Sequence, residues 1–157
     1  MSVTTLRNAH TLETPITGTR NATALLVPAG RALFAAIFLS AGFSHFNPGT
    51  IAYAASTGLP FASFLVPASG VLALLGGLSI LTGWHARLGA AALIAFLVPV
   101  TLAMHAFWKV ADPMAASMQY VMFMKNVGLL GGALLIAHFG AGPFSLDSRR
   151  AAPARIR

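Results

Sequence analysis

The chain has 157 residues and a formal net charge of +7, yet only 8% of its residues are charged, against roughly 25% in a soluble domain. Its mean hydropathy is +0.77, and it contains no cysteine. These values exclude a soluble globular domain, disulfide chemistry, thiolate metal sites and haem attached through thioethers. They indicate a membrane protein built as a single domain.

The N-terminal part of the chain changes from polar to apolar near residue 29. Residues 1–28 lack the apolar stretch of a cleavable signal peptide, and their Ser/Thr-rich composition predicts a disordered cytoplasmic tail. Residues 30–46 then form an apolar run close to the ~18–20 residues that an α-helix needs to cross a bilayer. We expect the first membrane span here.

A short helix is expected in the first connection. Asn47 followed by Pro48 is typical of a helix start, and Gly58 is typical of the residue just after a helix end. Residues 48–57 therefore predict an interfacial helix, with Tyr53 as an anchor at the membrane surface.

Three further apolar runs cover residues 60–83, 86–108 and 117–139. Lipid offers no hydrogen bonds to an open backbone, so runs of this length must be helices. Pro99 predicts a kink in the third span. The Gly128-x-x-x-Gly132 pattern in the fourth predicts close helix packing within the chain rather than a dimer contact.

Short connections between these spans predict an all-α fold, an integral membrane antiparallel four-helix bundle. The bundle is expected to occupy residues 29–147, and residues 148–157 a basic cytoplasmic tail.

Cationic side chains are distributed unevenly among the tails and connections. The connections 47–59 and 109–116 carry only Lys109 and Asp112, whose charges cancel. The two tails and the turn between spans two and three carry all eight arginines: Arg7, Arg20, Arg31, Arg87, Arg149, Arg150, Arg155 and Arg157. The positive-inside rule then predicts a multi-pass protein of the bacterial inner membrane with both termini in the cytoplasm. The same distribution argues against a nucleic-acid-binding surface, which would cluster its cations on one soluble face.

Three ionisable side chains are expected to meet in the outer half of the bundle. His45 and His105 lie near the outer ends of their spans, and Lys125 lies ~12 Å inside the fourth span. A lysine at mid-membrane costs about 2.5–3.5 kcal/mol, so we expect Lys125 to face the bundle interior. A cation beside two imidazoles would suit a quinone oxygen or a small anion.

The predicted ligand-binding set adds polar neighbours to these three, with Gln119 nearby: His45, Tyr53, His105, Lys109, Lys125 and Asn126. The alternative is that Lys125 only extends toward the headgroups and the histidines bind backbone carbonyls.

Metal binding is a second interpretation of the same region. Met114, Met118 and Met122 share one helix face, and thioether sulfur together with His105 would suit Cu(I). His45 and His105 would also provide a ligand pair for a b-type haem. We favour neither, because methionine is an ordinary apolar filler and the single histidine pair lies at the membrane edge.

On the inner side, the ends of three spans bring further charges together. Arg31 and Arg87 begin spans one and three, and Asp147 follows span four. We expect these residues to form a structural ion-pair cluster at the base of the bundle.

Several short motifs follow one another in a fixed order along residues 30–147. They are residues 31–46, residues 53–60, Gly76-Gly77-Leu78 with Gly83, His105, Lys125-Asn126, and residues 140–147. Together they resemble the DoxX family of small bacterial membrane proteins. The resemblance implies a four-span cytoplasmic-membrane protein associated with respiratory or sulfur redox systems. The family's namesake group is linked to thiosulfate:quinone oxidoreduction and to terminal quinol oxidase complexes.

These observations lead to a functional hypothesis. The chain encodes no redox centre, so it is expected to be at most one component of a quinone-linked oxidoreductase. We expect an accessory subunit of a respiratory or redox membrane complex, with a quinone- or quinol-facing cavity on its outer side and with lipid and other complex subunits as partners. The alternatives are a purely structural or assembly subunit, and a small transporter or copper-handling protein.

Overall fold

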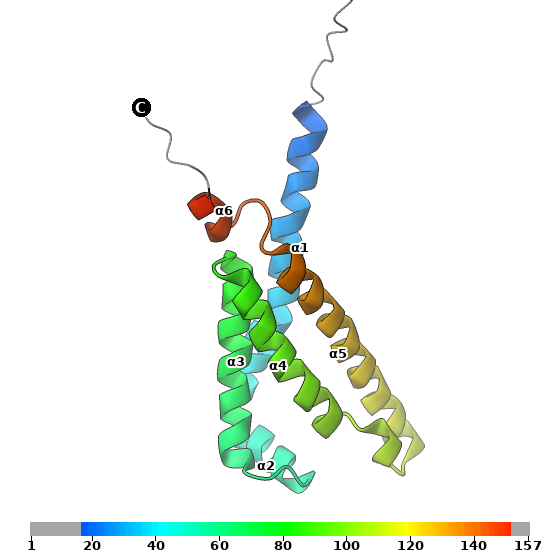
Figure 1. Ribbon diagram of the computed structural model, residues 1–157. Helices are drawn as coiled ribbons and strands as arrows, with labels where there is room; N and C mark the ends of the chain where they lie inside the picture. The colour runs from blue at the N-terminus through cyan, green and yellow to red at the C-terminus, as the bar shows by residue number, and fades with distance from the viewer. Residues whose placement is uncertain (1–16, 152–157) are drawn as a thin grey trace, which may run out of the picture.

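The computed structural model describes residues 17–151, and within that range the chain is all-helical, with no strand. The elements are α1 (Thr17–Ser44), α2 (Pro48–Ser56), α3 (Ala62–Thr82), α4 (Ala86–Met104), the 3-10 helix η1 (Phe107–Lys109), α5 (Pro113–Phe139) and α6 (Leu146–Ala151) (Figure 1). Four segments are long and apolar enough to span a membrane: 23–44, 62–82, 86–109 and 113–139. The predicted all-α, four-span fold is confirmed.

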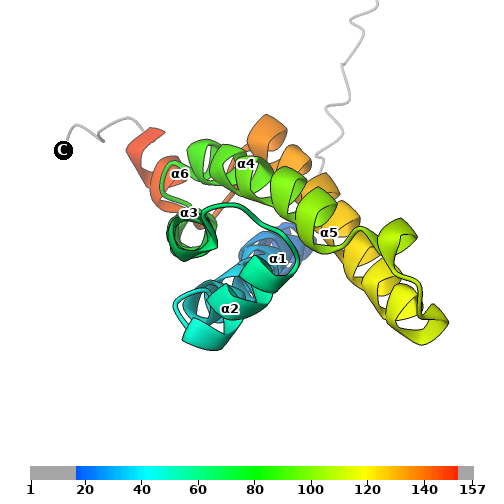
Figure 2. The same cartoon turned by 90° about the horizontal axis from the view of Figure 1, so that it is seen from below.

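The four long helices run in alternating directions and pack in chain order. α1 packs against α3, α3 against α4, and α4 against α5. We call the end that carries α2 and η1 the α2 end, and the opposite end the α6 end. Toward the α2 end, α5 leans away from α1 and α2, so the bundle opens like a wedge (Figures 1 and 2).

Glycine pairs set two of the helix crossings. A Cβ at Gly70 of α3 would lie 3.0 Å from the Gly42 carbonyl oxygen of α1, and a Cβ at Gly76 would lie 3.0 Å from the Gly89 carbonyl oxygen of α4. Only residues without a side chain allow the backbones to approach this closely. The spans therefore pack through van der Waals contact of bare backbone.

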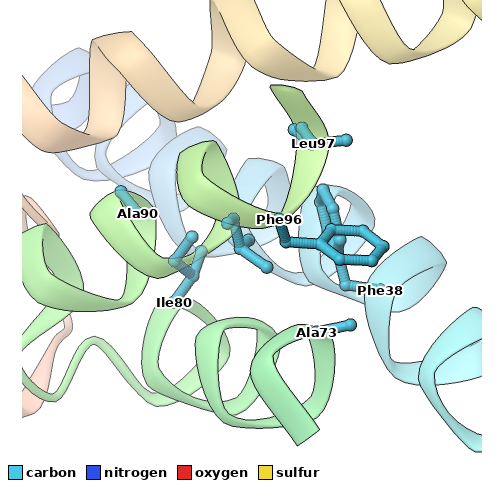
Figure 3. Close-up of a cluster of buried hydrophobic side chains, with 7 residues drawn as sticks. Phe38, Ala73, Ile80, Ala90, Phe96 and Leu97 are labelled. Carbon is cyan, nitrogen blue, oxygen red and sulfur yellow. The ribbon is translucent and has the colours of Figure 1, made fainter. Parts of the chain in front are cut away.

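The core lies between α1, α3 and α4 (Figure 3). It is a cluster of buried apolar side chains: Phe38, Ala73, Ile80, Ala90, Leu93, Phe96 and Leu97. α5 joins it with half-buried residues, and Phe34 of α1 fills the space above Gly132 of α5. A Cβ at Gly128 would meet nothing in the described chain within 4 Å beyond the backbone of its own helix. Only one of the two glycines in the predicted small-residue motif therefore packs within the chain.

The short helix α2 forms as predicted. The Asn47 side chain accepts a hydrogen bond of 2.8 Å from the Gly49 N–H, and proline follows it at the start of the helix. Gly58 adopts a φ of 86° just beyond the helix. Ala54 packs α2 onto Ala62 and Val66 of α3.

The predicted boundaries differ from the structure at three places. α1 begins at Thr17, so residues 17–28, predicted as tail, are helical, with Pro28 inside the helix. A proline within a membrane helix is tolerated when neighbouring groups compensate for its missing N–H. The fourth span begins at Pro113, where the Asp112 side chain accepts from the Ala115 N–H. Residues 148–151, predicted as tail, belong to α6 (Leu146–Ala151). Residues 1–16 and 152–157 lie outside the described range.

The charged cluster at the α6 end binds backbone. The guanidinium of Arg31 donates to the carbonyl oxygens of Ala141 (2.9 Å) and Phe144 (2.6 Å). The carboxylate of Asp147 accepts from the N–H groups of His85 (2.8 Å) and Ala86 (3.1 Å).

Arg87 is exposed beside Gly140. The prediction of a three-way ion-pair cluster is therefore corrected. Arg31 holds the segment between α5 and α6 to α1, and Asp147 holds α6 to the start of α4, in both cases through main-chain groups.

Candidate functional site

A cavity of about 410 Å³ lies at the α2 end, between the end of α1 and helices α2, α3 and α4. Most of its wall is apolar and comes from leucine, valine, alanine and aromatic side chains of these helices. Five polar side chains interrupt this wall: His45, Thr50, Tyr53, Ser69 and His105. A concave, largely apolar site with a few polar groups is the usual form of a small-molecule site.

His45 is held on one side of the cavity by three contacts. It follows the last residue of α1, and its Cβ lies against Gly70, where a side chain at position 70 would come within 2.8 Å. Its ring stands 5.7 Å from the ring of Phe96, centroid to centroid. Its Nδ1 lies 2.8 Å from the hydroxyl oxygen of Ser69. The imidazole is thus fixed in position from α3 and α4.

His105 enters the cavity from the other side. It is the first residue after α4, and its N–H still donates to the Thr101 carbonyl. Its Nδ1 lies 2.8 Å from the side-chain oxygen of Gln119 on α5. The Gln119 amide in turn donates to the hydroxyl of Tyr53 at 3.5 Å. This chain of contacts links α4, α5 and α2 across the mouth of the wedge.

Pro99 contributes to the wall from the middle of α4. Proline has no N–H, so the carbonyl of Ala95 lacks its usual helical donor. Ala95, Phe96 and Pro99 all line the cavity. The predicted interruption of the third span therefore lies at the site itself.

The structure brings together three of the six predicted ligand-binding residues and leaves three outside. His45, Tyr53 and His105 line the cavity. Lys109 is exposed in η1, and Asn126 is buried in the middle of α5. Neither of these lines the cavity.

Lys125 departs most clearly from the expectation. Its side chain is exposed, and its ammonium lies 3.3 Å from the sulfur of Met122 rather than beside the histidines. Asn126 and Ala133 define the packed face of α5, and position 125 is about 100° around the helix from position 126. Toward the α2 end α5 also leans away from α1 and α2 (Figures 1 and 2), and the Lys125 side chain stays exposed.

Two contributors to the site were not predicted as members. Ser69 is one of several hydroxyl residues in an apolar span, and Gln119 was recognised only as a polar neighbour of the lysine. A serine or glutamine within a span is itself a signal, because its polar group needs a partner away from water. The sequence does not show that these partners are the two histidines.

The methionines of the copper alternative are spread along α5. Met114 and Met118 are 82% and 59% exposed, and Met122 contacts the Lys125 ammonium. His105 binds Gln119 through Nδ1. In the haem alternative, both histidines do line one cavity.

Comparison with known proteins places the chain in a family. The DoxX family model matches residues 26–106. The inner membrane protein YqjF of Escherichia coli (strain K12) is 32% identical over 119 residues, covering 74% of this chain and 85% of that protein. The inner membrane protein YphA of the same strain is 30% identical over 115 residues, covering 72% and 81%. The chain belongs to the DoxX family. No solved structure gives a significant match.

Family membership agrees with the observed fold. Together with the four apolar helices, it makes this DoxX-family chain a multi-pass protein of the bacterial inner membrane. The matched region, residues 26–106, includes every residue of the cavity wall, whereas Gln119 lies beyond it.

Proposed function

We propose that this protein is an accessory subunit of a redox membrane complex and binds a quinone or quinol in the cavity at its α2 end. The observation that carries the proposal is the placement of His45, His105 and Tyr53 in one mostly apolar cavity. A quinone ring is apolar on its faces and polar at two opposite edges. Hydrogen-bonding side chains on different walls of an apolar cavity suit that distribution.

The cavity faces the outer side of the membrane in this proposal. The α6 end carries Arg31, Arg87, Arg149 and Arg150, whereas Lys109 and Asp112 balance each other at the α2 end. An excess of arginine on the cytoplasmic side is the normal pattern. A ligand would therefore be exchanged with the outer half of the bilayer.

Exposed Lys125 supports the role of a subunit within a larger complex. It lies near the middle of a span, where an ammonium facing lipid is unfavourable by about 2.5–3.5 kcal/mol. The three acidic residues of the chain, Glu13, Asp112 and Asp147, all lie outside the four spans. A second copy therefore has no carboxylate at the matching depth. A membrane helix of another subunit that carries an aspartate or glutamate would neutralise the charge.

Ligand extraction from purified protein tests the proposal. We expect one quinone or quinol per chain after isolation in mild detergent, and at least about tenfold weaker binding of that ligand in a His45→Ala, His105→Ala double variant. Lys125→Met, outside the cavity, should leave ligand occupancy unchanged and weaken association with the complex. Protein that purifies without either form of the ligand, and binds neither when both are added, would contradict the ligand proposal and favour a purely structural subunit.

A further inference from the structure

The hydrogen bonds behind the two cavity histidines determine where their protons lie. A neutral imidazole carries one N–H, and the nitrogen without it is an acceptor. Which nitrogen is protonated follows from the group that faces it. In both histidines the Nδ1 atom lies against a polar side chain, Ser69 for His45 and Gln119 for His105, so that side chain decides what Nε2 offers to a ligand.

For His45 the deciding group is the hydroxyl of Ser69. That hydroxyl donates to the carbonyl of Val66, three residues earlier in α3, at 2.7 Å. A hydroxyl has a single proton, so its oxygen can only accept from the histidine at 2.8 Å. The proton of His45 therefore lies on Nδ1, and Nε2 carries a lone pair.

For His105 the deciding group is the amide of Gln119. Its oxygen lies 2.8 Å from Nδ1, and its NH₂ group lies on the side of the Tyr53 hydroxyl, to which it donates at 3.5 Å. A carbonyl oxygen accepts only, so Nδ1 of His105 must donate. His105 is then the second histidine whose Nε2 is left with a lone pair.

Both histidines thus offer acceptors, and the cavity calls for a ligand with two donors. We infer that the site selects the reduced ligand, an apolar ring bearing hydroxyl groups such as a hydroquinone, over the quinone with its two carbonyls. This inference rests on the proposed function and specifies its ligand. A quinone would place carbonyl oxygens against lone pairs and leave the imidazoles unpaired, which a buried polar site penalises strongly.

Tyr53 fits the same ligand. Its oxygen accepts from Gln119, so its own proton remains for a ligand oxygen. A hydroquinone hydroxyl can donate to an imidazole and accept from the tyrosine at once. Ser69 and Gln119 are positioning residues in this scheme, because each acts on the ligand through a histidine.

Binding measurements on the full-length protein in nanodiscs test the inference. The probes are an alkyl-substituted benzohydroquinone, the matching benzoquinone, and the hydroquinone dimethyl ether, which keeps the ring but has no donor. At neutral pH and without oxygen, we expect the hydroquinone to bind at least about tenfold more tightly than either of the others.

The variants separate proton placement from packing. Ser69→Ala and Gln119→Leu each remove the acceptor that faces Nδ1 of one histidine and should reduce the hydroquinone-to-quinone preference by several-fold. A general packing defect would weaken both ligands equally. Ser63→Ala, an exposed serine of the same helix, should leave the preference unchanged. Nitrogen NMR of histidine-labelled protein gives an independent measurement, since it reports directly which ring nitrogen carries the proton.

The outcomes are distinct. Equal affinities, or tighter quinone binding, would overturn the inference and leave the proposed function standing. Binding of none of the three probes would overturn both. A metal ion retained in proportion to protein and lost in His105→Ala would also overturn the inference, since the metal would occupy the nitrogen assigned to the ligand.

Discussion

Gly83 lies where three parts of the α6 end meet. It follows α3 with a φ of 67°, and its carbonyl accepts from the Asp147 N–H at 2.9 Å. A Cβ at this position would collide with the Arg31 guanidinium and with the Ser145 side chain. Backbone conformation and space both require glycine here.

We expect Gly83→Ala to lower the stability of the bundle by about 1–3 kcal/mol, because the added methyl group overpacks a position that also disfavours a side chain. The measurement is the apparent unfolding temperature in one fixed detergent. Gly128→Ala is the matched control, since a Cβ there would meet nothing in the described chain within 4 Å beyond the backbone of its own helix, and alanine favours a helix. Equal losses in the two variants would contradict this account.

At the scale of single residues, the sequence identified part of the site for a physical reason. His45 and His105 lie near the ends of apolar runs, and Tyr53 lies in the short helix that connects two of them, so the depth of all three in the membrane follows from residue count alone. Lys125 was misplaced because its direction depends on the rotation of α5, which the packing of Asn126 sets. The depth of a residue in the membrane can be predicted from the sequence of its own span. The direction in which its side chain points depends on how that helix packs against its neighbours.

Among the elements, α4 depends on α6 for its N-terminal cap. Its own N-cap residue, His85, makes no side-chain cap and has a φ of 49°. Asp147, which belongs to α6, supplies both carboxylate oxygens to the first N–H groups of α4. A negative charge is favourable at this end of a helix.

The ionisation of Asp147 gives this contact a pH dependence. Burial raises the pKa of Asp147, but the hydrogen bonds from His85 and Ala86 and the charges of His85 and Arg150 outweigh it, so the pKa lies below 3.8. A carboxyl whose pKa falls on folding stabilises the protein above its unfolded pKa. That stabilisation is lost as the pH falls through the folded pKa.

We therefore expect Asp147→Ala to cost about 0.5–2 kcal/mol at neutral pH, which is typical of a lost helix cap. The difference between wild type and variant should be constant over about pH 5 to 8 and should vanish in strong acid. Unfolding by denaturant at several pH values measures it. A difference that grew as the pH fell would show that the carboxylate does not act in this way.

Element lengths explain which boundaries were predictable. The hydrocarbon thickness fixes about 20 residues per span, so the existence and order of the four spans could be predicted. Helical residues beyond the four apolar runs, such as 17–22 and 148–151, carry no apolar signal and were assigned to tails. Contacts between distant parts of the chain, such as those of Asp147, hold α6 in place.

For the whole molecule, the charge distribution predicts one orientation in the membrane. The chain has no cysteine, so single cysteines can be introduced at exposed positions of each end. We expect a maleimide that cannot cross the inner membrane, applied to the outer face of that membrane, to label the Ser56→Cys variant at the α2 end. Pro143→Cys at the α6 end should react only after the membrane is opened. The reverse pattern would place the cavity on the cytoplasmic side.

The exposed face of α5 has a consequence for how the protein behaves outside its membrane. Only 11% of this span is buried inside the described chain, the lowest share among the four spans. Acyl chains must cover the rest wherever no neighbouring subunit does, so lipid becomes part of the tertiary structure on this flank. A solubilising amphiphile with a short or bulky tail would cover α5 poorly and let the helix move. The distance between Gln119 and His105 would then depend on the surrounding lipid or detergent as much as on the chain itself.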